Sequence, residues 1–251
     1  MYLSHFYYND EGLIELMTVK TRNVLTPSPP SSKIVVSARP APYNFDVSHT
    51  ALIMIDMQRD FLEKGGFGEM LGNNISNLGD VAERCGELLT WARFMKMRII
   101  HTQEAHNQNL SDFPPSKLTR GILSCGIGDV GPLGRALVEG AAGSDFVGSC
   151  TPLPGETVVR KPGKGAFYAT SLNDQLHFGG YTHLIIAGVT TEVCVQTTMR
   201  EANDRGFECL LIEDCTASYF PEFKRATIEM VAAQGGIVGW VCNLEALKIH
   251  V

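Results

Sequence analysis

The sequence lacks the features that mark several classes of protein. No hydrophobic run approaches the roughly 18 residues that a membrane-spanning helix needs, and the first twenty residues, which include Asp10, Glu11, Glu15 and Lys20, hold no unbroken apolar segment typical of a secretory signal. An excess of positive charge is also missing, because the net charge at pH 7 is −6. We therefore expect neither a membrane nor a nucleic acid as a partner.

Paired cysteines are absent as well. The seven cysteines are an odd number, are scattered along the chain and include no Cys-x-x-Cys pair. This argues against a disulfide framework and against a zinc knuckle, and it is typical of a reducing compartment, so we expect a cytoplasmic protein. Cys209, Cys215 and Cys242 fall in or beside apolar strands and are most simply interpreted as small core residues.

The domain organisation follows from length and proline content. With 251 residues, of which 44% are hydrophobic and 19% charged, one large α/β domain is favoured over two small ones. Residues 1–45 are predicted to form an N-terminal arm, because five prolines lie between positions 26 and 42. The arm either wraps the domain or a neighbouring subunit, or is loosely held. The domain itself is expected to cover residues 46–251.

Strand-like and helix-like segments alternate after the arm. Apolar runs typical of strands lie at 51–55, 98–102, 157–160, 182–187, 208–212 and 236–241, and helical spacing is found at 81–95, at 172–178, from about 191, at 224–234 and at 243–249. This alternation predicts a doubly wound, mostly parallel sheet of about six strands flanked by helices, a Rossmann-like three-layer α/β sandwich. Residues 104–156, rich in Gly, Pro and Ser, are expected to form a lid or an interface.

Cys194 is the first candidate for a catalytic residue. It follows the apolar run 184–187 and stands near the start of a predicted helix, for which Thr191 can serve as N-cap and Glu192 suits the first turn. The positive end of a helix dipole and its unpaired N–H groups favour thiolate over thiol. With an ammonium group nearby, we expect the pKa of this thiol to fall by about two units, which makes it a nucleophile.

Asp56 and Lys161 stand at the ends of two further predicted strands. Taken singly, Asp56 is as well explained as a helix cap or a partner of Arg59, and Lys161 as an ordinary surface lysine. Because the carboxyl ends of parallel strands share one edge of the sheet, both residues should converge there with Cys194. A carboxylate, an ammonium and a thiol at one place form a nucleophilic site, with Asp56 as general base and Lys161 favouring the thiolate.

Three segments resemble the isochorismatase-like cysteine hydrolase superfamily: residues 51–61 (ALIMIDMQRDF), 161–165 (KPGKG) and 188–194 (GVTTEVC). The resemblance spans about residues 47–245 and implies a catalytic triad of Asp56, Lys161 and Cys194. It also implies a cis peptide bond at Val189–Thr190 and an oxyanion hole made by the backbone N–H groups of Thr190 and Cys194. Isochorismatases proper do not use a cysteine for vinyl-ether hydrolysis, so its presence here favours amide chemistry.

Four shorter segments resemble the biuret and triuret hydrolase branch, with ureidoacrylate amidohydrolases as neighbours: residues 101–106 (HTQEAH), 131–135 (GPLGR), 198–206 (TMREANDRG) and 234–236 (QGG). This likeness implies a substrate pocket with Phe61, Tyr168 and Gln234, and Glu104 and His106 are further substrate-binding candidates. The Asp-x-His metal site of the family's nicotinamidases is lacking, which implies an enzyme without metal or cofactor. Homo-oligomers are usual in the family, so we expect a dimer or tetramer.

The sequence thus predicts a metal-independent cysteine amidohydrolase that cleaves a C–N bond of a small, linear, urea-like amide of the biuret or triuret type, through a thioester, with release of ammonia or an amine. A hydrolase for ureidoacrylate or an N-carbamoyl amide is the alternative within the class. Outside it stand a nicotinamide-dependent oxidoreductase and a non-catalytic metabolite-binding or redox-sensing protein. Residues 126–131 fit G-x-G-x-x-G, but no strand precedes them. Neither rival explains the positions of Asp56 and Lys161.

Overall fold

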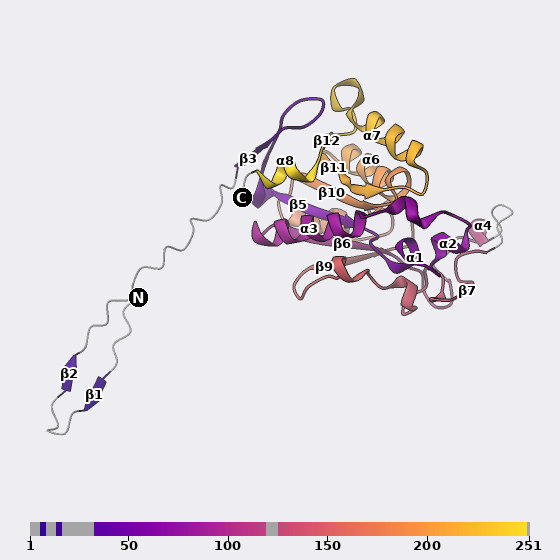
Figure 1. The fold of residues 1–251 in the computed structure, drawn as a ribbon, viewed down its shortest axis with the longest axis horizontal. Coiled ribbons are helices and arrows are strands. Elements are labelled where there is room, and N and C mark those ends of the chain that lie inside the picture. Colours follow the sequence, from indigo (N-terminus) through magenta and orange to yellow (C-terminus); the bar gives the residue numbers. More distant parts are fainter. Residues whose placement is uncertain (1–5, 9–13, 17–32, 119–124, 250–251) are drawn as a thin grey trace.

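The centre of the protein is a six-stranded parallel sheet. The computed structural model describes residues 6–8, 14–16, 33–118 and 125–249 (Figure 1). The strand order is β12-β11-β10-β5-β6-β9, and each neighbouring pair is parallel. The strands are β5 (Thr50–Ile55), β6 (Arg98–Glu104), β9 (Thr157–Lys161), β10 (His183–Val189), β11 (Glu208–Ala217) and β12 (Trp240–Cys242). The predicted doubly wound α/β fold is therefore confirmed.

The central strands are apolar because both faces of the sheet are covered. All six residues of β5 are buried, and its successive side chains point to opposite faces. Leu52 and Met54 belong to one hydrophobic cluster, whereas Ile53 and Ile55 belong to the other. Strand β9, at one edge, alternates between exposed and buried residues instead.

Helices cover both faces, as Figure 1 shows. On one side lie α3 (Val81–Phe94) and α8 (Leu244–Lys248), and on the other lie α5 (Leu172–Phe178), α6 (Gln196–Asp204) and α7 (Pro221–Gly236). Helix α7 leaves the helical conformation between Ala233 and Gly235, and β12 starts only at Trp240. The strand expected at 236–241 is therefore shorter and begins later. No helix among the described residues is both long and apolar enough to span a membrane.

A hairpin in the predicted arm belongs to the core. Strands β3 (Lys33–Val36) and β4 (Tyr43–Asp46) pair antiparallel, and their side chains Ile34, Val36 and Phe45 are part of the cluster that contains α3. We therefore propose that the domain begins at Lys33 and not at residue 46. Strands β1 (Phe6–Tyr8) and β2 (Ile14–Leu16) form a separate antiparallel pair, and the prolines between 26 and 32 lie outside the described residues.

The long segment after β6 packs against the loops that follow β5. It contains α4 (Pro115–Leu118), the short strands β7 (Val130–Gly131) and β8 (Gly134–Arg135), and two 3-10 turns, whereas α1 (Arg59–Leu62) and α2 (Phe67–Met70) follow β5. The buried carboxylate of Asp60 joins the two parts, because it accepts the backbone N–H groups of Phe67 and Leu137, at 3.3 and 2.8 Å. The described part of segment 104–156 is thus anchored beside the carboxyl edge of the sheet.

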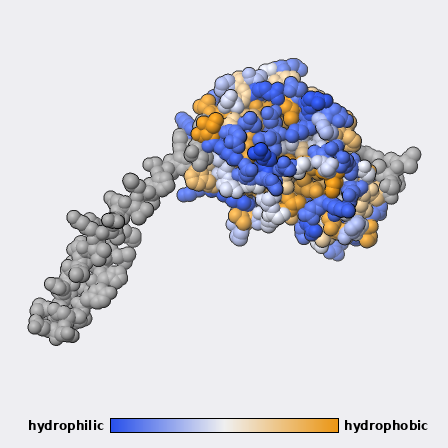
Figure 2. All heavy atoms as spheres, viewed as in Figure 1, coloured by the Kyte–Doolittle hydropathy of each residue, from blue (hydrophilic) through white to orange (hydrophobic). Residues whose placement is uncertain are grey.

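Cys209, Cys215 and Cys242 are buried core residues with free thiols, as expected. The face of the molecule shown in Figure 2 is mostly hydrophilic, with hydrophobic residues in separate small patches, which is usual for a protein surface. The homo-oligomeric state and the cytoplasmic location stay predictions.

Candidate active site

Four reactive side chains meet at the carboxyl edge of the sheet, each supplied by a different strand. Asp56 follows β5, Glu104 is the last residue of β6, and Lys161 is the last residue of β9. Cys194 lies in one turn of π-helix (η5, Thr191–Val195) that follows β10. All four are at most 3% exposed. The structure therefore brings together the aspartate, lysine and cysteine that the sequence singled out, and it places Glu104, predicted as a substrate-binding residue, directly beside them.

Asp56 is held in place by Thr102 on the neighbouring strand. Its backbone is in the left-handed region, with φ +48°, and its Oδ1 accepts a hydrogen bond of 2.6 Å from the Thr102 hydroxyl. Its other oxygen, Oδ2, lies 2.7 Å from Lys161 Nζ. Asp56 does not pair with Arg59, because the Arg59 guanidinium bonds Glu63 at 2.8 Å. The simpler explanation of Asp56 as a partner of Arg59 is therefore wrong.

Lys161 is a fully buried cation and not a surface lysine. Its ammonium group contacts Asp56 Oδ2 and donates to the carbonyl oxygens of Gly163 and Lys164, at 2.9 and 3.0 Å. Burial lowers the pKa of Lys161, but the negative charges around it, led by Asp56, more than offset this and raise the pKa above its usual value. Lys161 is therefore charged throughout the physiological range, with three acceptors for its three protons.

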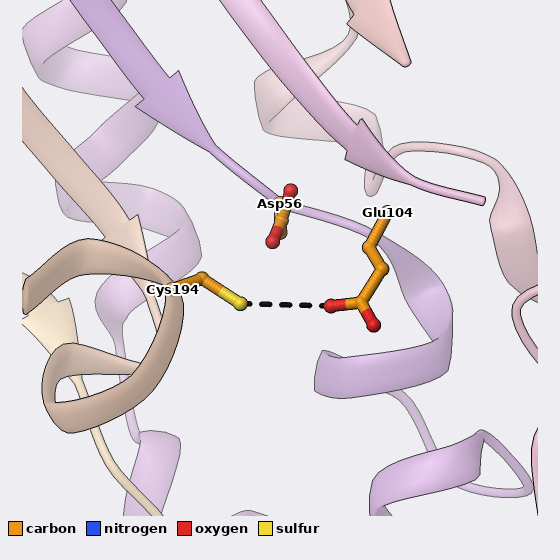
Figure 3. A group of neighbouring side chains, drawn as sticks. All are labelled: Asp56, Glu104 and Cys194. Atoms are coloured by element: carbon orange, nitrogen blue, oxygen red, sulfur yellow. Dashed lines mark hydrogen bonds between the residues drawn. The ribbon is translucent and has the colours of Figure 1, made fainter. Parts of the chain in front are cut away.

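Glu104 touches both the thiol and a second lysine. Its Oε2 accepts a hydrogen bond from Cys194 Sγ at 3.6 Å, which Figure 3 shows as a dashed line, and its Oε1 lies 2.5 Å from Lys164 Nζ. Gln58 fixes its backbone, donating to the Glu104 carbonyl at 3.0 Å and accepting from the Glu104 N–H at 2.8 Å. Burial raises the pKa of Glu104, but Lys164 and then Lys161 lower it by more, so this carboxyl is ionised.

The thiol of Cys194 is protonated at rest, contrary to our expectation. Burial raises its pKa well above the usual value; Lys161 opposes this, and the carboxylates of Asp56 and Glu104 add to it. The expectation of a lowered pKa considered the helix end and one ammonium. It did not consider the burial of the sulfur or the second carboxylate. Deprotonation therefore needs a local proton acceptor.

The start of the nucleophile helix also differs from the prediction. Thr190, and not Thr191, occupies the N-cap position, and its side chain makes no capping bond. The Thr191 hydroxyl instead bonds the Thr216 hydroxyl at 2.8 Å, which ties the turn to β11. The first turn is a π-helix, and α6 begins at Gln196.

The peptide bond between Val189 and Thr190 is cis, as the resemblance implied. The Thr190 carbonyl accepts the N–H groups of Val193 and Val195, at 3.1 and 3.3 Å. This pair of bonds ties the cis peptide to the turn that carries Cys194. The oxyanion-hole role of the Thr190 and Cys194 N–H groups stays a prediction.

Three of these side chains form a set that a metal ion would suit. Ligand atoms of Asp56, Glu104 and Cys194 all lie within 4.8 Å of one another. The cation beside this set is the Lys161 ammonium, which is 2.7 Å from Asp56 and 3.6 Å from Glu104. A metal ion entering here would meet the charge of this ammonium.

The remaining predicted substrate-binding residues have different surroundings. Tyr168 is 57% exposed and packs beside Gly163, on the loop that follows Lys161. Phe61 is partly buried and packs against the core. His106 is buried, lies edge-on to the ring of Phe113, and has its Nδ1 3.5 Å from an Asp112 carboxylate oxygen.

Gln234 is not brought to the site. Helix α7 starts after the carboxyl end of β11 and runs back to the start of β12, which is parallel to β11. Gln234 lies near the end of this 16-residue helix, which spans on the order of 20 Å. It is therefore at the amino edge of the sheet, where Gly236 packs beside Pro40, and a role in binding substrate at the opposite edge does not fit.

Two residues of the site were missed in the sequence. Thr102 lies two positions before Glu104 on β6, so the period of two along a strand was the available signal. Lys164 lies three positions after Lys161, in a segment whose glycines and proline drew attention to the first lysine only. A lysine on the tight turn that follows β9 could have been predicted to return to the carboxyl edge of the sheet.

The comparisons with known proteins agree with this architecture. The family described as "Isochorismatase domain" matches residues 50–242. A ureidoacrylate amidohydrolase RutB from Methylorubrum extorquens is 27% identical over 227 residues, which cover 88% of this chain and 90% of that protein.

Solved structures show the same fold. An isochorismatase family protein from Desulfovibrio vulgaris superposes with a TM-score of 0.67 at 24% identity, covering 80% of this chain and 97% of that one. The N-carbamoylsarcosine amidase from Thermoplasma acidophilum superposes with a TM-score of 0.59 at 18% identity, covering 77% of this chain and 95% of that one.

Proposed function

The chain belongs to the isochorismatase family, and from this premise we propose that it is a cysteine amidohydrolase that cleaves the C–N bond of a small carbamoyl compound, such as ureidoacrylate or an N-carbamoyl amide. The observation that carries the proposal is the buried Cys194 thiol beside Asp56 and Glu104, with the Lys161 ammonium between the carboxylates. A thiol with a proton acceptor beside it at the carboxyl edge of a parallel sheet is suited to acyl transfer.

The relatives favour the ureido alternative over a biuret-type substrate. The curated relatives are named for ureidoacrylate, and a structural neighbour is named for N-carbamoylsarcosine. These compounds and biuret share a carbamoyl group, so the site chemistry is the same for all of them. The biuret and triuret preference that the sequence suggested is therefore less well supported than its alternative.

The charges of the site support the assignment of Asp56 as the base. The carboxylates of Asp56 and Glu104 and the ammonium groups of Lys161 and Lys164 sum to zero, so losing the thiol proton to bulk water would leave a buried net negative charge. Transfer of that proton to a carboxylate keeps the sum unchanged. The lowered pKa makes Glu104 a poor acceptor, and Asp56, also within 4.8 Å of the sulfur, takes the proton.

Catalysis then proceeds in two half-reactions. The Cys194 sulfur attacks the carbonyl carbon, and the backbone N–H groups of Thr190 and Cys194 stabilise the oxyanion. Asp56 protonates the leaving nitrogen as the C–N bond breaks, which gives a thioester and releases ammonia or an amine. Asp56 next removes a proton from water, which attacks the thioester and restores the thiol. Lys161 stays charged and keeps Asp56 in position.

The test is an ammonia-release assay with ureidoacrylate, N-carbamoyl amino acids, biuret, triuret and nicotinamide. We expect the wild-type protein to cleave a ureido compound, and Cys194→Ala to lose at least about a thousandfold in kcat/KM. Cys242→Ala is the matched control, because Cys242 is a buried core thiol in the edge strand β12 and should keep wild-type turnover. Wild-type activity in Cys194→Ala, or no cleavage of any compound by the wild-type protein, would contradict the proposal.

A further inference from the structure

The two lysines of the site are used differently. The Lys161 ammonium has acceptors for all three of its protons and no exposed surface. Within the part of the chain that the structure describes, the Lys164 ammonium has a single hydrogen-bond partner, Glu104, and its side chain is 44% exposed. An ammonium group has three donors, so Lys164 keeps two for another acceptor. It is the lysine of this group that an entering molecule can reach.

Glu104 lies between the Lys164 ammonium and the thiol of Cys194. One carboxylate oxygen accepts the Cys194 thiol at 3.6 Å, and the other is 2.5 Å from the Lys164 ammonium. The backbone of Glu104 is held in place, because its N–H and carbonyl groups both bond the Gln58 amide. The Lys164 ammonium and the Cys194 sulfur therefore contact the two oxygens of the same carboxylate, so a small molecule that reaches the sulfur comes close to this ammonium.

We propose that Lys164 is a specificity-determining residue that binds a carboxylate on the part of the substrate beyond the cleaved bond. This inference rests on the proposed function and narrows it to carbamoyl compounds with an anionic end. A hydrogen bond between an ammonium and a carboxylate is charge-assisted and about twice as strong as one to a neutral oxygen. Glu104 positions Lys164 for this contact and keeps it charged, since its own charge raises the pKa of Lys164 against the effect of burial.

The backbone contact between Lys164 and Lys161 is kept when the Lys164 side chain is replaced. The backbone carbonyl oxygen of Lys164 accepts a hydrogen bond from Lys161 Nζ at 3.0 Å, and this bond does not depend on the Lys164 side chain. Lys164→Met removes the charge and keeps much of the chain length, whereas Lys164→Arg keeps the charge. Lys248→Met is the matched control, because Lys248 also pairs with a glutamate, Glu87, on the surface away from the site.

The experiment compares N-carbamoylglycine with its neutral amide, two compounds that differ only in the charge of the far end. We expect Lys164→Met to lower kcat/KM for the acid by about ten- to a hundredfold, mainly through KM, and to change the neutral amide much less. Lys164→Arg should restore most of the loss, and Lys248→Met should match the wild type. A loss through Glu104 or through the fold would affect both compounds equally, and that result would overturn the proposal, as would an unchanged Lys164→Met.

Binding separates failure of this inference from failure of the proposed function. In a Cys194→Ala background, calorimetric titration with N-carbamoylglycine reports recognition without turnover. Weaker binding of the acid after the additional Lys164→Met change supports the role of Lys164 even where the wild-type protein hydrolyses neither compound. Equal binding of the acid with and without Lys164 overturns it, even where the wild-type protein is an active amidohydrolase.

Discussion

Replacing Lys161 with methionine is expected to destabilise the protein by about 3–5 kcal/mol, although methionine fills a similar volume. The change leaves the carboxylate of Asp56 buried without its partner at 2.7 Å, and both side chains have no exposed surface. It also removes the donor to the carbonyl oxygens of Gly163 and Lys164. The variant is expected to have no measurable turnover.

The magnitude follows from opposing terms. At an effective dielectric constant of about 20, opposite charges at this distance attract by roughly 6 kcal/mol, and the cost of removing both from water offsets most of that gain. The intact pair therefore contributes little net stability, whereas one buried charge left without its partner lowers the free energy of unfolding. Asp56→Asn together with Lys161→Met removes both charges, so the double variant should be about 2 kcal/mol more stable than Lys161→Met alone.

Urea denaturation of the wild-type protein, the two single variants and the double variant measures this cycle. A loss below about 1 kcal/mol in Lys161→Met would refute the description of a buried, mutually dependent pair. Additive effects of the two changes would refute it as well.

Three further predictions concern other parts of the structure. Burial raises the pKa of Glu156, but hydrogen bonds led by that from Arg93 lower it to about 2. The ionised carboxylate of Glu156 therefore stabilises the folded protein fully above pH 4.5, and this contribution is lost as the pH falls toward 2. Glu156→Gln should flatten the acid limb of stability measured by urea titration, and an unchanged limb contradicts this. Gly188 has φ +114° and an added Cβ would lie 2.0 Å from the Ile55 carbonyl oxygen, so Gly188→Ala should lose about 3 kcal/mol or fail to fold; a wild-type melting temperature refutes it. Because the pKa of Cys194 is raised chiefly by burial, its alkylation by iodoacetamide should be slow at pH 7 and still rising at pH 9, and a plateau near neutrality would disprove a protonated resting thiol.

The sheet was predictable because its strands are buried on both faces. Runs such as 51–55 and 182–187 are nearly continuous in apolar residues, and parallel strands covered by helices require that pattern. The last strand was misplaced because α7 does not end where its helical spacing ends. Gln234 takes a left-handed conformation with φ +52°, and the turn of glycines after it carries the chain to Trp240 before pairing begins.

The positions of the reactive groups were predictable, and their electrostatics were not. Asp56 and Lys161 stand at or directly after the end of a strand, and Cys194 lies in the first turn after one, so parallel topology alone sends them to one edge. The direction of the thiol pKa depends on burial and on Glu104, which are properties of the packed site. Gln234 was predicted to bind substrate because a three-residue segment resembles a known family. So short a segment does not show which end of its helix lies at the active-site edge of the sheet.

The burial of the Cys194 thiol in its neutral form affects how readily the sulfur is oxidised. Peroxides and electrophilic metabolites react with sulfur in proportion to its anionic character and its accessibility. Cys194 is only 3% exposed, and burial raises its pKa well above the usual value. The sulfur of Cys194 is therefore expected to resist oxidation while no substrate is bound.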